Sequence, residues 1–425
     1  MRPFHEKPAP KPCRPLKLRS PPEATPTLIE TKPAPQSSAG ASSDSPRKRL
    51  SYVPHLDGLR GIAILLVMAF HFTQGVRLQN PFTGAAVDMA SGLFIGVDVF
   101  FVISGFLITR ILLATNLTKR AYLVFTMRRV LRIFPPYWFY LIACLALLPA
   151  LRQYSARDYL NDHWLWFFTY TNNIRIALEG WPASYLSHLW SLAIEEQFYL
   201  IWPIVLVLLA FFRSWLPFLV LAVLGPPLAR FILAETGANP LALYVLLPTR
   251  LDPLAIGALI AFCESRGLMR HCHKAMKLLA IPAGIFMVVY LVERSLSGVS
   301  VFSMPARVAG QHFATGLLSG VLITAGITRA GVVKDLFTRT WIVKVGKVSY
   351  SLYLWHFAVN ATFRNTDLHP QAFGRADLPV EVYLLVYLVL AGLISYLIAI
   401  VSWKYFEEPV LRLKRFFPSP AGRPA

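Results

Sequence analysis

The chain has few cysteines, and they are too scattered to predict a disulfide framework. One of the four lies between His271 and His273, but this short cluster sits in a basic loop with no second pair of ligands at metal-binding spacing. We therefore expect no metal site. The four cysteines of the 425-residue chain are Cys13, Cys144, Cys263 and Cys272.

Acidic residues are also scarce, because 22 Asp and Glu stand against 42 Lys and Arg, for a formal net charge of +20. In a soluble protein such a charge would suggest a nucleic-acid partner. No basic patch is interleaved with aromatic residues on a soluble module, however, so we expect no nucleic-acid binding. The basic residues fall instead between apolar runs, where they orient membrane spans.

What the chain has in abundance is apolar sequence: 55% of its residues are hydrophobic and its mean hydropathy is +0.51. Apolar runs long enough to cross a bilayer recur after residue 50. The sequence predicts an all-α polytopic membrane protein with about ten transmembrane helices in one bundle. The expected spans are 57–77, 92–114, 135–151, 189–212, 215–233, 242–263, 278–294, 310–328, 345–365 and 382–404.

Three regions follow from this pattern. Residues 1–50 are rich in Pro, Ser and Ala and should form a disordered tail, residues 51–410 should form the membrane domain, and residues 411–425 a short basic tail. The cluster Arg47-Lys48-Arg49 directly before the first span, with ten spans after it, predicts that both termini are cytoplasmic. Residues 163–178 also suit a re-entrant aromatic segment.

The stretch Leu59–Phe72, within the first expected span, carries Arg60 and His71. Eleven residues separate them, which returns an α-helix to within roughly 20° of the same face about 16 Å further along. Ionisable groups inside a span are costly and mark functional sites. The alternative is that Arg60 reaches a lipid headgroup while His71 bonds a neighbouring helix.

The second stretch, Gly96–Thr109, places the carboxylate of Asp98 inside a span, where it needs a partner. We expect that partner to be Arg60 or His71, whereas Arg250 and Asp252 should form a local ion pair of their own. Small residues in the same stretch favour close helix packing. They are Gly96, Ser104 and Gly105.

The third stretch, 125–138, contains Arg128, Arg129 and Arg132. Arg129 and Arg132 share one helical face, and arginines bind phosphates through forked hydrogen bonds. The commoner reading is simple anchoring at the cytoplasmic surface. We expect the following Pro135-Pro136 pair to end this helix and start the next span.

A fourth stretch, 187–199, carries a polar stripe at 3-4-4 spacing, which lies along one helical face. A histidine, a carboxylate and a phenol together suit proton transfer or a hydroxylated ligand, although such a stripe also locks helices together. The stripe residues are His188, Ser191, Glu195 and Tyr199, with Glu196 beside them. A polar and aromatic run, Ser349–His356, enters the ninth span, and Glu407-Glu408-Pro409 closes the last one.

Taken in order, these stretches resemble the acyltransferase-3 family of integral membrane acyltransferases. The resemblance extends from about Leu56 to Pro409 and rests on the segments 57–71, 96–107, 128–133, 188–199, 349–356 and 407–409. It implies a ten-helix bundle in a bacterial inner membrane that moves an acyl group, usually acetyl, from cytoplasmic acyl-CoA to a carbohydrate or glycolipid hydroxyl. Many relatives carry an SGNH-type esterase domain after the bundle. None follows here, so we expect direct transfer within the membrane domain.

The resemblance makes Arg60 and His71 essential and assigns the arginine pair to Arg129 and Arg132. We expect His71 to act as general base, oriented by Asp98 or Glu195, or alternatively to be acylated transiently. Arg60 would hold the thioester carbonyl or a phosphate.

The remaining candidates divide between donor and acceptor. Arg129 and Arg132, with Arg128, would grip the phosphates of acyl-CoA, which is a co-substrate and not a permanently bound cofactor. The acceptor would meet His188, Ser191, Glu196 and Tyr199. The competing hypothesis is a proton-coupled transporter or flippase, since buried ionisable groups also build proton relays.

Overall fold

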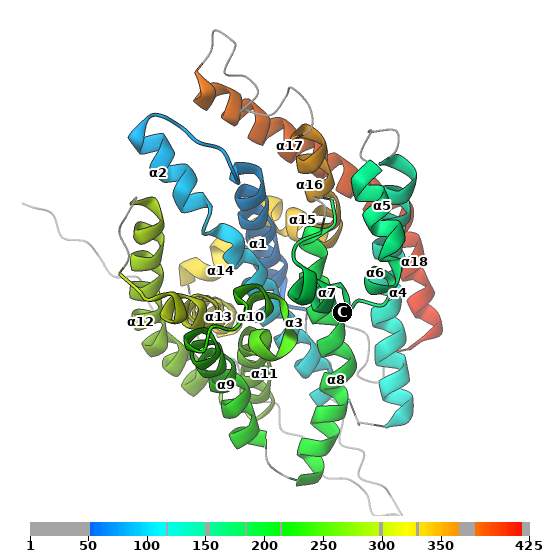
Figure 1. Cartoon of the computed structure of the whole chain (residues 1–425). Helices are drawn as coiled ribbons and strands as arrows, with labels where there is room; N and C mark the ends of the chain where they lie inside the picture. Colours follow the sequence, from blue (N-terminus) through cyan, green and yellow to red (C-terminus); the bar gives the residue numbers. More distant parts are fainter. Residues whose placement is uncertain are drawn as a thin grey trace, which may run out of the picture. The chain divides into compact units, whose positions relative to one another are not determined.

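The computed structural model describes residues 52–115, 118–148, 154–182, 185–212, 215–296, 301–328, 331–364 and 379–418. Every regular element in these ranges is a helix, which confirms the all-α prediction (Figure 1). The predicted tail 1–50 lies outside the described residues, and the tail 411–425 is described only as far as residue 418.

Eight helical segments among the described residues are long and apolar enough to cross a membrane, so the chain is a polytopic membrane protein. Four are single helices of 20 to 29 residues, namely α1 (Pro54–Thr73), α4 (Lys119–Leu147), α9 (Trp215–Glu235) and α13 (Met304–Ile327). A fifth is α12 (Met269–Ser295). The other three join consecutive elements: α2 (Pro81–Ala90), η1 (Leu93–Ile95) and α3 (Gly96–Leu113); η2 (Ser187–Leu189) and α8 (Trp190–Phe212); and α17 (Val380–Ser402), η4 (Trp403–Glu407), α18 (Glu408–Arg412) and η5 (Leu413–Phe416).

Two of the ten predicted spans are shorter than expected. The predicted span 242–263 is broken into α10 (Pro240–Val245), η3 (Leu247–Arg250) and the 15-residue α11 (Leu251–Ser265). The predicted span 345–365 is divided into α15 (Thr340–Lys347) and the 16-residue α16 (Ser349–Arg364). Most side chains of α11 and α16 are buried, so these helices lie inside the bundle and carry polar groups that a lipid-facing helix excludes.

Short helices complete the described part of the chain. They are α5 (Tyr154–Asp162), α6 (Trp164–Phe168), α7 (Asn172–Glu179) and α14 (Gly331–Phe337). Residues 163–178, where we considered a re-entrant segment, therefore form the two short helices α6 and α7.

The centre of the bundle is the contact of α3 with α11, and α1 packs beside it against α3 and α15 (Figure 1). The first contact depends on two glycines. A Cβ on Gly105 would lie 1.9 Å from the carbonyl oxygen of Leu254, and one on Gly257 would lie 2.1 Å from that of Val102. The two backbones touch because neither residue has a side chain, as the small residues of α3 predicted.

The outer helices present apolar side chains where lipid would lie. On α17 these exposed residues are Leu385, Val386, Val389, Leu390, Leu393, Leu397 and Val401. In a soluble protein such a row would be buried, so the surface agrees with a bilayer environment.

The helix α4 contradicts one expectation. It continues through Pro135 and Pro136 without a break, so the prediction that these prolines separate an interfacial helix from a span is wrong. Prolines are tolerated in membrane helices where neighbouring groups satisfy the backbone. In the same region of α4 the Tyr350 hydroxyl of α16 donates a 2.8 Å hydrogen bond to the Ile133 carbonyl, which ties α4 to α16.

Candidate active site

Two cavities lie along α1, one beside Arg60 and the other beside His71. The first, which we call the arginine chamber, has a volume of about 70 Å³ and is lined by residues of α1, α3, α4, α8 and α16. The second, the aromatic chamber, has a volume of about 570 Å³. Arg60 and His71, predicted on one face of the helix about 16 Å apart, thus line different cavities.

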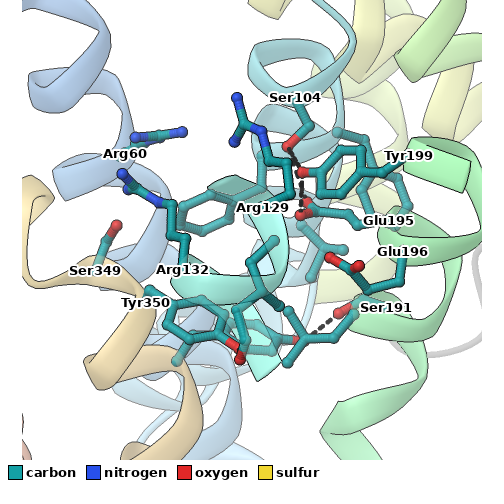
Figure 2. A pocket seen from close by; sticks show the side chains of 16 residues that line it. Arg60, Ser104, Arg129, Arg132, Ser191, Glu195, Glu196, Tyr199, Ser349 and Tyr350 are labelled. Atoms are coloured by element: carbon teal, nitrogen blue, oxygen red, sulfur yellow. Dashed lines mark hydrogen bonds between the residues drawn. The ribbon is translucent and has the colours of Figure 1, made fainter. Parts of the chain in front are cut away.

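The arginine chamber gathers the cations of two helices. Arg60 comes from α1 and Arg129 and Arg132 come from adjacent turns of α4, and Figure 2 shows their guanidinium groups on one side of the pocket. The Arg129 guanidinium lies 5.6 Å from the centre of the Tyr199 ring. Arg60 has a carboxylate partner in Asp57, at 3.7 Å. Three guanidinium groups in one small cavity suit a ligand with several negative charges.

The opposite wall of the chamber comes from α8 and α3 (Figure 2). The Tyr199 hydroxyl donates to Glu195 Oε2 at 2.8 Å and lies 2.9 Å from Ser104 Oγ, which donates to Glu195 Oε1 at 3.2 Å. Glu196 follows on the same wall. The 3-4-4 spacing thus brings Ser191, Glu195 and Tyr199 together, whereas His188 lies in the other cavity.

Arg128 faces elsewhere. Its Nη1 donates to the carbonyl oxygens of Phe417, at 2.8 Å, and Lys414, at 3.5 Å. Arg128 therefore ties the last helical turn of the described chain to α4, and its guanidinium is occupied away from the chamber that Arg129 and Arg132 line.

The aromatic chamber combines ring faces with polar groups. Its aromatic side chains are Phe70, Phe94, Trp181, Trp190, Tyr244, Tyr290 and Phe357. Its amides are Gln74, Gln311 and Asn360, and its cations are Arg294 and Arg364. Aromatic faces beside hydrogen-bonding groups form a surface that suits a hydroxyl-rich ligand better than a purely apolar one.

Three histidines meet beside this chamber. The centre of the His356 ring on α16 lies 5.1 Å from that of His71 and 5.6 Å from that of His188. His71 Nδ1 lies 2.9 Å from His356 Nε2. The sequence marked His356 only as the end of an aromatic run, because no local spacing connects it with a residue 285 positions earlier.

The two chambers share a wall. The Tyr353 hydroxyl donates to the His188 carbonyl oxygen at 2.8 Å and lies 2.5 Å from Ser191 Oγ. Tyr353 and Ser191 line the arginine chamber, while His188 lines the aromatic one. Tyr353 therefore connects residues that line the two chambers.

Asp98 belongs to neither chamber. It is fully buried on α3, where it accepts hydrogen bonds from Arg250 at 2.6 Å and from His312 Nδ1 at 2.9 Å. The prediction that Arg60 or His71 partners Asp98 is therefore wrong. The first turn of α3 presents this carboxylate to η3 and α13, a choice that depends on tertiary packing and not on the sequence of α3.

The predicted local pair of Arg250 with Asp252 is also wrong. Asp252 accepts two hydrogen bonds from Arg230 of α9, at 2.7 and 2.9 Å, while Arg250 reaches Asp98. Arg250 thus links η3 to α3, and Asp252 links α11 to α9. Within the described residues no group of three or more His, Cys, Asp and Glu side chains is placed to hold a metal ion.

Over most of its length the chain is similar to proteins named as O-acetyltransferases. Over 382 residues the chain is 29% identical to the "Peptidoglycan O-acetyltransferase OatA" of Listeria monocytogenes. The aligned region covers 84% of the chain and 56% of that protein. Over 379 residues it is 28% identical to the "Putative O-acetyltransferase SACOL0978" of Staphylococcus aureus, and this aligned region covers 85% of the chain and 58% of that protein. No solved structure matches the chain.

The chain spans a little over half the length of these relatives. A shorter match, 36% identical over 168 residues, is to the "Putative peptidoglycan O-acetyltransferase YrhL" of Bacillus subtilis and covers 37% of the chain and 24% of that protein. The acyltransferase domain family matches residues 53–404, which include both chambers and every helix that lines them. The chain is therefore a multi-pass membrane protein that belongs to this acyltransferase family.

Proposed function

We propose that the chain is a membrane O-acetyltransferase that moves an acetyl group from acetyl-CoA to a hydroxyl of a bacterial cell-surface glycan. The observation that carries the proposal is the pair of chambers along α1, with Arg60 in one, His71 in the other and a shared wall between them. One chamber suits a polyanionic donor and the other a sugar acceptor.

The donor occupies the arginine chamber in this proposal. Acetyl-CoA carries phosphates, and Arg129 and Arg132 offer forked hydrogen bonds that a phosphate accepts in pairs. Arg60 then holds either a phosphate or the thioester carbonyl oxygen, where it stabilises the negative charge that develops during transfer. Because acetyl-CoA is made in the cytoplasm, this chamber faces the cytoplasm of a bacterial inner membrane, and both termini lie on that side.

The acceptor occupies the aromatic chamber. Trp181, Trp190 and Tyr244 offer ring faces on which a sugar can stack, and Gln74 and Asn360 offer hydrogen bonds to its hydroxyls. His188 also lines this cavity. Among the acceptor residues expected from the sequence, Ser191, Glu196 and Tyr199 line the donor chamber and are better placed to position the thioester.

The reaction needs a base, and His71 is the residue we assign. His71 takes the proton of the acceptor hydroxyl, and the hydroxyl oxygen attacks the thioester carbonyl carbon. The carbon–sulfur bond then breaks, and the coenzyme A thiolate leaves with the proton that His71 returns. The products are an O-acetyl ester and free coenzyme A, with no net change of protonation on the enzyme.

The class of acceptor that we propose is taken from the names of the similar proteins. Two of the names, those of the Listeria monocytogenes and Bacillus subtilis proteins, contain the word peptidoglycan. We therefore propose the glycan strand of peptidoglycan as the first acceptor to test, followed by other carbohydrates and glycolipids.

The test is transfer of radiolabel from acetyl-CoA to peptidoglycan fragments in membranes that contain the protein. His71→Ala should abolish labelling while acetyl-CoA still binds, whereas the exposed His271→Ala should label as the wild type does. Labelling by His71→Ala at the wild-type rate would contradict the base assignment. A wild-type protein that binds no acetyl-CoA but moves glycan across the membrane would be a transporter instead.

A further inference from the structure

His356 makes a second hydrogen bond that decides the chemistry of the histidine cluster. Its Nδ1 lies 2.9 Å from the carbonyl oxygen of Leu352, one turn earlier on α16. A carbonyl oxygen only accepts, so Nδ1 must carry the proton and donate. The His356 ring is completely buried, which favours neutral imidazole with a single ring proton. Its Nε2 therefore holds a lone pair.

This arrangement sets the proton position on the next ring. His71 Nδ1 is 2.9 Å from His356 Nε2, and a hydrogen bond between them requires one proton. Since His356 Nε2 accepts, His71 Nδ1 donates. The lone pair of neutral His71 must then be on Nε2, the atom that remains for a ligand in the aromatic chamber.

The same helix also holds the backbone of His71. Asn360, one turn after His356 on α16, donates from Nδ2 to the His71 carbonyl oxygen at 3.1 Å. The Phe357 ring meets the His71 ring edge-on, with centres 4.6 Å apart. One face of α16 thus fixes the main chain, the ring plane and the ring proton of a residue on α1.

We propose that His356 is a positioning residue that holds His71 in the tautomer with a free Nε2, so that this atom receives the acceptor proton. The inference rests on the proposed function of His71 as base. When Nε2 takes the proton, the ring becomes positive and the Nδ1 hydrogen bond to His356 becomes charge-assisted and stronger. The role matches that of the carboxylate in a serine-protease triad, with a neutral acceptor in its place.

The titratable groups around His71 are consistent with a neutral acceptor. The His356 ring lies against its ring, His188 packs on His356, and Arg364 of α16 lies 3.4 Å from its carbonyl oxygen. The resolved hydrogen bonds of Asp98 and Glu195 go to other residues. The orienting role predicted for one of these two carboxylates therefore falls to His356.

Three substitutions of His356 test the inference in the labelling assay with acetyl-CoA and peptidoglycan fragments. His356→Gln places a carbonyl oxygen near the former Nε2 and so keeps a hydrogen-bond acceptor there. His356→Leu keeps a side chain of similar volume but removes the acceptor. We expect kcat to fall by about 100-fold or more for the Leu variant and by about tenfold or less for the Gln variant. The KM for acetyl-CoA should stay within about twofold in both, since the donor lies in the other chamber.

The third variant, His356→Glu, adds a readout that loss of structure does not reproduce. A carboxylate beside Nδ1 stabilises protonated His71, so the acid limb of the kcat profile should move to higher pH by about one unit. Equal loss in the Gln and Leu variants with no shift for Glu, in proteins that still bind acetyl-CoA, would overturn the tautomer role. An error in the base assignment itself is detected separately: if His71 is not the base, His71→Ala transfers acetyl normally.

Discussion

The buried carboxylate of Asp98 offers a test of how the bundle is held together. Asp98→Ala removes one partner from a cluster in which Asp98 and Arg250 are fully buried and lie 2.6 Å apart. Removing one member of a buried ion pair costs about 3–5 kcal/mol, because the other charge is left without compensation. His312 loses its 2.9 Å contact in the same substitution, so we expect the upper part of this range.

The free energy of unfolding is measured by SDS titration of the detergent-purified protein. Asp158→Ala is the matched control, since Asp158 pairs with Arg157 at 3.7 Å on the exposed face of α5 and its loss should cost about 1 kcal/mol or less. Asp98→Ala combined with Arg250→Met should recover about 1–3 kcal/mol relative to Asp98→Ala alone, because the stranded guanidinium is gone. A stable Asp98→Ala protein that has lost only acetyl transfer would refute this reasoning and return Asp98 to the chemistry.

Three further predictions concern the chambers and the helix contacts. Arg129→Ala should raise the KM for acetyl-CoA by about 10- to 100-fold in initial-rate measurements, as expected for a charge-assisted hydrogen bond of about 1.5–3 kcal/mol, while Arg120→Ala at the exposed start of α4 should not. Gly257→Leu should abolish the monodisperse peak in size-exclusion chromatography because its Cβ would lie 2.1 Å from a carbonyl oxygen of α3, whereas Gly284→Leu, which meets open space, should elute normally. Tyr353→Phe removes the hydroxyl contacts in the shared wall, so release of free coenzyme A without acceptor should rise several-fold, and an unchanged rate would show that the wall does not limit leakage.

The features that the sequence predicts well are local ones. Apolar length identifies the eight long spans, and helical periodicity places Arg60 and His71 on one face and Arg129 beside Arg132. Each of these follows from residues within a few turns of one helix. The same local reasoning fails for α11 and α16, because a helix in the interior of a bundle need not be as long or as apolar as one that faces lipid.

The contacts that could not be predicted from the sequence join residues far apart in the chain. Asp98 has two candidate cations nearby in the early sequence, yet it binds Arg250 and His312, which are 152 and 214 residues away. His356 and His71 are separated by 285 residues. Periodicity specifies which face a side chain occupies, but the partner on that face is decided by helix packing. Gly105 and Gly257 set that packing for α3 and α11, and their joint effect is visible only when both helices are in place.

We propose that donor and acceptor bind in different chambers, on opposite sides of the membrane. The most direct measurement uses sealed, inside-out membrane vesicles that hold peptidoglycan fragments in the lumen, with radiolabelled acetyl-CoA added outside. We expect the trapped fragments to become labelled while coenzyme A appears only outside, and we expect neither with His71→Ala. Labelling confined to fragments added on the same side as acetyl-CoA would contradict it.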